Sequence, residues 1–297
     1  MLRVSQAYPY TTVDLQNYLE GIEKIKYKKE LMERETIVNT TGKNKIEVLT
    51  IKEANPRLKK RPVIFIMARQ HPGETPGSYV LEGLLDSLLS KEKDSEYLRR
   101  HYEIRVVPMV NPDGVCAGNY RTNLHGFDLN RRWEGSRNKN MHEAAYLKKY
   151  MSGLFRGRDV AFILDLHGHS RKLYSFFYGN SSTANPVEIR LFPLMCSKLS
   201  PHCIRFEDST FACEEQKRYT ARIQCNLSYK CLNIFTYETS FFGYVGKDKE
   251  KKHFTMDGFR QLGGALARAI YLHERGKESE LNKIEHKDSV LYKKCMK

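Results

Sequence analysis

A histidine and a glutamate three residues apart follow an apolar stretch. The stretch is residues 63–67, and the chain continues Arg69-Gln70-His71-Pro72-Gly73-Glu74. A second histidine, His167, follows the apolar run 160–164, within Asp165-Leu166-His167-Gly168-His169. Two histidines and one carboxylate are the ligand set of a hydrolytic zinc site that keeps its fourth position open to water. The pattern therefore indicates a metal-dependent hydrolase with His71, Glu74 and His167 as ligands.

Either motif alone is a weak signal. An isolated His-x-x-Glu or His-Gly-His sequence is more often structural than metal-binding, and His169 is an alternative to His167 as the third ligand. The position of the motifs favours a site, since both come directly after a predicted buried strand. In open α/β sheets, ligands bind outside the carboxyl ends of the strands.

Composition indicates a globular protein. The chain has 297 residues, of which 40% are hydrophobic and 29% charged, enough for one large α/β domain. No apolar run approaches the ~20 residues of a membrane span, and residues 1–6 lack the apolar core of a signal peptide. The net charge of +15 suits nucleic acid, an anionic membrane surface, an acidic protein or simply a basic solvated surface.

The cysteines argue against a disulfide framework or a zinc ribbon. There are seven, an odd number, and no Cys-x-x-Cys pair occurs. Reduced thiols in the cytosol or nucleus are therefore expected. Three glycosylation sequons, at Asn39, Asn180 and Asn226, are read as coincidental because no secretory signal precedes them.

Hydrophobic periodicity predicts alternating strands and helices. A helix within 12–34, capped by Asp14 or a neighbouring threonine, precedes a hairpin around 42–44. Further strands are predicted at 61–68, 102–108, 160–166, 173–178 and 232–238. Further helices are predicted at 76–92, 141–155, 186–200 and 255–274, with a long loop at 109–140 and an irregular stretch at 201–230. This alternation predicts a single α/β/α sandwich with a mixed, mostly parallel central sheet.

Several further blocks stand in a characteristic order. They are Asn111-Pro112-Asp113-Gly114, Gly118-Asn119-Tyr120-Arg121, Asp128-Leu129-Asn130-Arg131 and Thr236-Tyr237-Glu238. Together with the two histidine motifs, they resemble the M14 metallocarboxypeptidases. The subfamily they resemble most is the cytosolic carboxypeptidases, which process tubulin. The resemblance covers roughly residues 7–275, and the absence of His-Glu-x-x-His excludes the thermolysin-like class.

The resemblance implies roles for the catalytic residues. The histidine–glutamate–histidine set would bind one Zn²⁺. Glu238 would be the general base, which takes a proton from the zinc-bound water and gives it to the leaving amine. Arg121 would polarise the scissile carbonyl and stabilise the oxyanion. Asp128 would orient His71, as a metal-bound histidine usually requires.

The resemblance also implies how a substrate is held. Asn130 and Arg131 would bind its terminal carboxylate, and a planar arginine fork suits that group. Arg222, with Lys217, would favour an acidic side chain, although a solvated basic loop is the alternative for this segment. Tyr219 is a candidate for a residue that covers the substrate.

Domain organisation follows from the same resemblance. We expect a lead-in helix and hairpin at 1–50, a zinc carboxypeptidase catalytic domain at 51–275 and a charged tail at 276–297. The resemblance leads us to expect little room in residues 1–50 for the β-sandwich domain that usually precedes the catalytic domain of the subfamily.

The expected function is removal of C-terminal amino acids, above all glutamate, from polyglutamylated proteins such as tubulin. The expected location is the cytoplasm, with microtubule association or a nuclear location as further options. A nucleic acid is not expected as a partner, because no binding motif for it is present. A membrane is not expected as a partner either. The alternatives are a catalytically weak relative that binds acidic tails and a deacylase of small acyl-amino acids.

Overall fold

A seven-stranded mixed sheet organises the protein. The computed structural model describes residues 5–55, 60–134 and 142–276. The strand order is β1-β2-β4-β3-β5-β7-β6, and the four central strands β4, β3, β5 and β7 run parallel. The strands of this sheet are β1 (Met32–Asn39), β2 (Lys45–Ile51), β3 (Val63–Ala68), β4 (Glu103–Val107), β5 (Val160–His169), β6 (Ser175–Tyr178) and β7 (Ile234–Ser240). Antiparallel strands close both edges, so the predicted mixed, mostly parallel sheet is confirmed.

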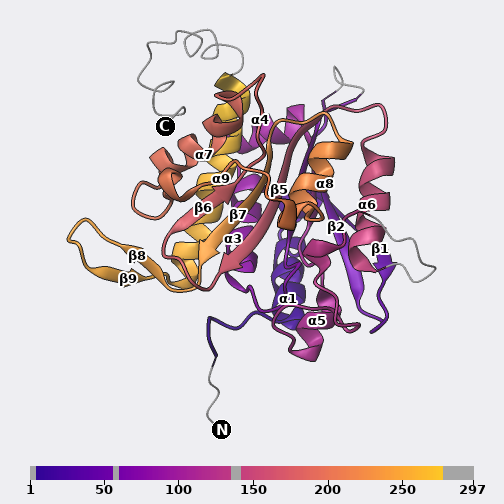
Figure 1. Ribbon diagram of the computed structural model, residues 1–297. Coiled ribbons are helices and arrows are strands. Elements are labelled where there is room, and N and C mark those ends of the chain that lie inside the picture. Colours follow the sequence, from indigo (N-terminus) through magenta and orange to yellow (C-terminus); the bar gives the residue numbers. More distant parts are fainter. Residues whose placement is uncertain (1–4, 56–59, 135–141, 277–297) are drawn as a thin grey trace.

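Helices cover both faces of the sheet (Figure 1). One face packs against α1 (Thr12–Glu23), α3 (Pro76–Leu88), α4 (Lys93–His101), α7 (Glu188–Leu199) and α9 (Met256–Gly276). The other packs against α6 (Glu143–Leu154) and α8 (Ala221–Ser228). Strand β3 explains the division, since Ile64 and Ile66 join the first core while Phe65 and Met67 join the second. Successive side chains of a strand point to opposite faces, so a strand buried on both sides reads as one continuous apolar run.

The start of the chain differs from its prediction. The helix predicted within 12–34 is two helices, α1 and α2 (Lys26–Leu31), and β1 already begins at Met32. Pairing of Met32 with Ile51 extends the hairpin back to this point, so tertiary pairing overrides helix propensity. The α1 cap is a reciprocal box in which the Thr11 hydroxyl and the Asp14 carboxylate each bond the other's backbone N–H.

Other elements were not predicted because their apolar patterns are short. Helix α4 buries only Ser95, Leu98 and Arg99. Helix α8 lies inside the stretch predicted to be irregular, and α5 (Pro112–Ala117) lies inside the long loop. A separate hairpin of β8 (Gly243–Val245) and β9 (Lys251–His253) projects from the body of the protein (Figure 1). The tail at 277–297 lies outside the described residues.

The parallel strands end at one edge, which positions the candidate site. Strand β3 lies next to β5, and β5 lies next to β7. In the register of these strands, Ala68 is level with Leu166, and His167 is level with Glu238. The segment that follows β3 therefore meets the last residues of β5 and β7, as expected for an α/β sheet. No helix in the described ranges combines the length and apolar character that crossing a membrane requires.

Candidate functional site

A buried arginine shapes the turn after β3. Arg69 has a φ of 59°, a left-handed conformation that is uncommon outside glycine and often marks a functional turn. Its guanidinium donates two hydrogen bonds to the carbonyl of Pro72, one to Ser78 Oγ at 2.8 Å and one to the carbonyl of Tyr10 at 2.9 Å. These bonds hold the His-Pro-Gly-Glu turn against the N-terminus of α3 and the segment before α1.

The same turn brings Arg121 to the site. The Gly73 N–H donates to the carbonyl of Tyr120 at 2.8 Å. A Cβ on Gly73 would lie 2.6 Å from the Tyr120 ring, so this close approach requires glycine. Next along the chain, Arg121 Nε donates to Asp128 Oδ2 at 2.7 Å, and Arg121 Nη1 lies 3.9 Å from Glu74 Oε1. The Arg121 side chain is 41% exposed, so it faces the solvent side of the site.

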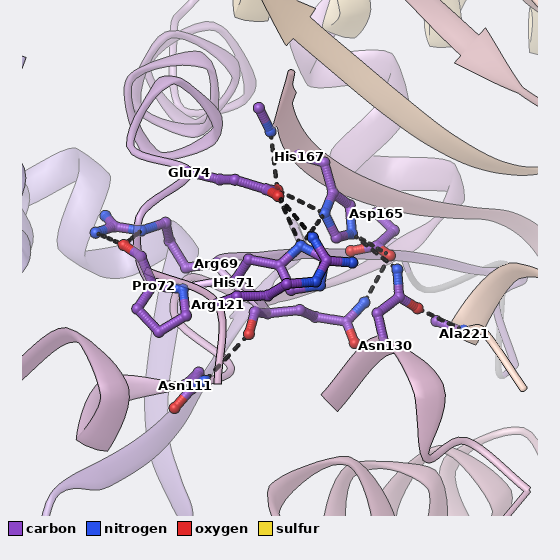
Figure 2. A network of polar contacts seen from close by, with 12 residues as sticks. Arg69, His71, Pro72, Glu74, Asn111, Arg121, Asn130, Asp165, His167 and Ala221 are labelled. Carbon is purple, nitrogen blue, oxygen red and sulfur yellow. Dashed lines mark hydrogen bonds and ion pairs between the residues drawn. The ribbon is translucent and has the colours of Figure 1, made fainter. Parts of the chain in front are cut away.

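His71, Glu74 and His167 converge on one point (Figure 2). Glu74 Oε1 lies 2.7 Å from His71 Nδ1, and Glu74 Oε2 lies 2.7 Å from His167 Nδ1. The two Nδ1 atoms are 3.2 Å apart, and the Gly168 N–H donates to Glu74 Oε2 at 3.1 Å. One ligand atom from each residue lies within 4.8 Å of the others, and all three residues are buried.

A carboxylate binds the outer nitrogen of each histidine. His71 Nε2 lies 3.0 Å from Asp128 Oδ1, and His167 Nε2 lies 2.8 Å from Asp165 Oδ2. With its outer nitrogen held, each ring presents Nδ1 to the shared point, which is how carboxylates orient metal-bound histidines. The donor set, its convergence and its outer carboxylates fit a divalent metal such as zinc.

A buried polar chain continues outward from Asp165. Its Oδ2 also accepts a hydrogen bond from Gln70 Nε2 at 2.6 Å, and Gln70 Oε1 accepts one from Trp133 Nε1 at 2.8 Å. Gln70 and Trp133 are fully buried, and Asp165 Oδ1 has no hydrogen-bond partner among the described residues. Asp165 therefore depends on Gln70 to hold it against His167.

Glu238 lies beside this group with a contrasting charge environment. It is opposite His167 in the parallel register, so both side chains share one face of the sheet. Burial raises the pKa of Glu238 to about 7; the charge of His167 opposes the rise and that of Glu74 adds to it. For Glu74, burial acts in the same direction, but the charges of His71 and His167 outweigh it and lower its pKa. Neighbouring carboxylates with divergent pKa values mark an acid–base site.

Asn130 and Arg131 lie at the edge of the site, on a single turn of 3₁₀ helix, Leu129–Arg131. Asn130 Nδ2 is 3.4 Å from His167 Nε2, and Asn130 Oδ1 accepts from the Ala221 N–H at 2.9 Å. Arg131 Nη1 donates to the carbonyl of Asn130 at 2.9 Å. The amide of Asn130 is thus locked between β5 and α8, whereas the partly exposed Arg131 forms no salt bridge among the described residues.

Arg222 is a buried cation that has no carboxylate partner among the residues described. It is 3% exposed, and its Nη1 donates to the carbonyl of Gly179 and to Asn180 Oδ1 at 2.9 Å. Within the described ranges it forms no salt bridge, and burial lowers its pKa. A buried charge of this kind is costly unless an anion joins it.

The other two predicted pocket residues are placed differently. Lys217 Nζ is paired with Glu214 at 3.1 Å and lies 4.4 Å from the centre of the Tyr178 ring. Tyr219 is 39% exposed, and its carbonyl accepts from the Trp133 N–H at 3.1 Å. The charge of Lys217 is therefore already balanced, while Tyr219 lies at the surface.

Four site residues were not predicted from the sequence: Arg69, Gln70, Trp133 and Asp165. For Asp165 a signal existed, since residues two apart in a strand share a face and Asp165 precedes His167 by two. The roles of the others depend on contacts between distant segments, which no local pattern records.

Comparison with known families matches residues 17–231 to the zinc carboxypeptidase (M14) family. Cytosolic carboxypeptidase 3 of Bos taurus is 34% identical over 87% of this chain and 26% of its own length. Cytosolic carboxypeptidase 2 of Homo sapiens is 34% identical over 86% of this chain and 29% of its own length. Cytosolic carboxypeptidase 6 of Caenorhabditis elegans is 33% identical over 88% of this chain and 59% of its own length. The chain thus spans less than two thirds of the length of these curated relatives.

Among solved structures, a metallo-carboxypeptidase from Burkholderia cenocepacia has the same fold. It superposes with a TM-score of 0.79 at 21% identity, covering 92% of this chain and 71% of that one. A carboxypeptidase A from Helicoverpa armigera gives a TM-score of 0.67 at 17% identity, covering 94% of this chain and 76% of the carboxypeptidase.

The first prediction tests which histidine of the His-Gly-His sequence is a zinc ligand. His167→Ala removes a converging Nδ1, so we expect purified protein to lose stoichiometric zinc. His169→Ala is the matched control, because His169 Nδ1 instead accepts from the backbone N–H groups of Arg171 and Lys172. Elemental analysis of the metal content measures both. Zinc retained by His167→Ala and lost by His169→Ala would reverse the assignment.

The second prediction concerns the buried chain behind His167. Trp133 is the only tryptophan, so tryptophan fluorescence reports on this series of buried hydrogen bonds alone. When zinc is added to metal-free protein, we expect the tryptophan emission to change. The midpoint of that change should coincide with the midpoint of zinc binding. In Gln70→Leu the zinc affinity should fall by about 10–100-fold, the usual effect of losing an outer partner, and the emission change should disappear. Met67→Leu, a volume-conserving change in the adjacent core, is the control. An unaltered affinity in Gln70→Leu would contradict the positioning role.

Proposed function

This chain belongs to the zinc carboxypeptidase family, and we propose that it is a zinc-dependent carboxypeptidase that removes glutamate from the C-termini of acidic proteins, tubulin among them. The observation that carries the proposal is the convergence of His71, Glu74 and His167 beside Glu238. These residues offer a metal ligand set and an adjacent base, the two elements that metal-assisted hydrolysis requires.

Zinc bound by the three ligands would polarise the scissile carbonyl and lower the pKa of a water molecule to about 7. Glu238 takes the proton of the attacking water and delivers it to the leaving amine. Its raised pKa suits both steps, because a group that titrates near neutral pH can accept and then release a proton. Arg121 donates to the developing oxyanion while Asp128 holds its Nε.

Asn130 and Arg131 receive the terminal carboxylate of the substrate. The Asn130 amide lies 3.4 Å from His167, so a carboxylate bound there is adjacent to the reacting carbonyl. Arg131 supplies a guanidinium without a carboxylate partner in the described ranges, a group suited to two parallel hydrogen bonds. This pair explains why an exopeptidase would require a free C-terminus.

Arg222 is the proposed selector for glutamate. It is buried and has no partner carboxylate in the described part of the chain, so the side chain of a C-terminal glutamate can neutralise it. Lys217 adds a second, weaker positive charge, because Glu214 already pairs with it. Tyr219 is exposed at the edge of the same loop and covers the bound residue.

The proposed partners are acidic protein tails such as those of tubulin, and the proposed location is the cytoplasm, in line with relatives named cytosolic carboxypeptidases. The net charge of +15 supports this, since opposite charge accelerates encounter with a polyglutamate tail. A protein that only binds tails would need neither the converging metal ligands nor the adjacent Glu238. For this reason we favour the peptidase over that alternative and over a deacylase.

The third prediction tests the base. Glu238→Gln keeps the size of the side chain but cannot accept the proton, so glutamate release from polyglutamylated tubulin should fall by about 10²–10⁴-fold while zinc content stays unchanged. A zinc chelator should abolish release by the native protein. Glu30→Gln, an exposed change in α2, is the control. Release by a zinc-free or Glu238→Gln protein at the native rate would refute the mechanism.

The fourth prediction tests the selector. Arg222→Gln should lower kcat/KM for peptides ending in glutamate by about 100-fold, which corresponds to the free energy of a buried hydrogen bond to a charged group. It should lower kcat/KM much less for peptides ending in a neutral residue. Lys217→Gln should have a smaller effect, because the Lys217 charge is already paired. Equal losses for acidic and neutral peptides would show that Arg222 is structural.

A further inference from the structure

Six exposed cations lie on two segments that adjoin the strand ends at the candidate site. Arg171 and Lys172 lie in the β5–β6 loop. The other four lie in the β8–β9 hairpin: Lys247, Lys249, Lys251 and Lys252. We call these six residues the basic strip. The hairpin contains two carboxylates, Asp248 and Glu250, so positive charge prevails.

Backbone hydrogen bonds join the two segments at the edge of the site. The Tyr174 N–H donates to the carbonyl of Gly243 at 2.8 Å, and the Ser240 N–H donates to the carbonyl of Tyr174 at 3.0 Å. The Phe241 N–H donates to the carbonyl of His169 at 3.0 Å. The two segments that carry the strip are therefore joined to each other next to the ends of β5 and β7, the strands that contain His167 and Glu238.

Most of the positive charge in the strip is uncompensated. Lys252 pairs with Asp248 at 2.7 Å, and Lys172 lies 4.5 Å from the centre of the Phe176 ring. Except for Lys252, no residue of the strip forms a salt bridge within the described ranges. Exposed cations that lack internal partners remain available to an external anion.

The strip and the carboxylate-binding residues flank the metal ligands. Asn130 is tied to Ala221 at the start of α8, whereas the β8–β9 hairpin projects from the other side of the sheet, away from α6 and α8 (Figure 1). A substrate whose last residue is held near Asn130 and Arg222 must cross the metal ligands. Its preceding residues then leave toward the strip.

We propose that the basic strip is a docking surface for the acidic residues that precede the cleaved one in a polypeptide substrate. The proposal rests on the proposed function and extends it, since it selects acidic chains by length as well as by the last residue. Exposed charge pairs are individually weak, so several cations along an extended hairpin are needed to affect binding. A polypeptide is favoured over a nucleic acid because the strip adjoins a site built for a peptide C-terminus.

The test compares two variants with the same change in net charge. Lys247→Gln/Lys249→Gln/Lys251→Gln removes three strip cations and leaves the Lys252–Asp248 pair. Lys24→Gln/Lys26→Gln/Lys29→Gln removes three exposed cations around the start of α2. That region leads to Met32, which pairs with Ile51 at the end of the sheet opposite to the site.

Binding is measured by fluorescence anisotropy with a labelled peptide of about ten glutamates, in a Glu238→Gln background so that the probe is not consumed. We expect the strip variant to bind about tenfold more weakly at low ionic strength and the α2 variant to bind like the parent. The difference should shrink as salt rises. Equal losses in both variants, or none in either, would overturn the proposal.

Turnover with active Glu238 provides the second arm. The strip variant should show a raised KM and an unchanged kcat for the long peptide, and native values for a blocked dipeptide ending in glutamate, which is too short to reach the hairpin. If the native protein hydrolyses neither peptide, the proposed function fails, while the anisotropy result still decides the strip. An oligonucleotide of equal charge that binds the strip more tightly than the peptide would replace the acidic polypeptide as its ligand.

Discussion

Two imidazoles and a carboxylate held within hydrogen-bonding distance inside a protein are the constraint on which the rest of this structure depends. Burying such groups is unfavourable unless each one has a partner. Glu74 lies between the inner nitrogens of His71 and His167, and Asp128 and Asp165 bind their outer nitrogens. The candidate ligand atoms of these three residues are thereby oriented, and a divalent cation would complete the balance of charge.

The segment 128–133 links the candidate metal ligands to the groups proposed to bind the substrate. Asp128 contacts His71, Asn130 lies next to His167, and Trp133 reaches Asp165 through Gln70. Its residues therefore contact the environments of both histidines and also provide the groups proposed to hold the substrate carboxylate. A change in this one segment would disturb the candidate metal ligands and the proposed substrate position together, because a densely packed, hydrogen-bonded network cannot adjust one part alone.

Positive charge is distributed by depth. Arg69 is buried and satisfied by carbonyl and hydroxyl oxygens, so it stabilises the ligand turn. Arg222 is buried and pairs with no carboxylate of the described residues, which is the basis for its proposed selection of an anion. The strip cations are exposed and screened by solvent, so their proposed role depends on number and position rather than on individual strength.

The sequence by itself determined the sheet, its two-faced burial and the candidate metal ligands. Continuous apolar runs such as 63–67 specify a strand buried on both faces, and the residues that follow such strands meet at one edge. The linear order could not specify α4 or α8, whose apolar stripes are short, nor the partners of Gln70 and Trp133. Only the tertiary structure decided that Arg222 is buried with no counter-ion among the residues it describes, that Glu214 neutralises Lys217 and that the β8–β9 hairpin borders the site. Those properties arise from contacts between residues far apart in the chain, and burial and pairing, rather than residue type, decide what a charge does.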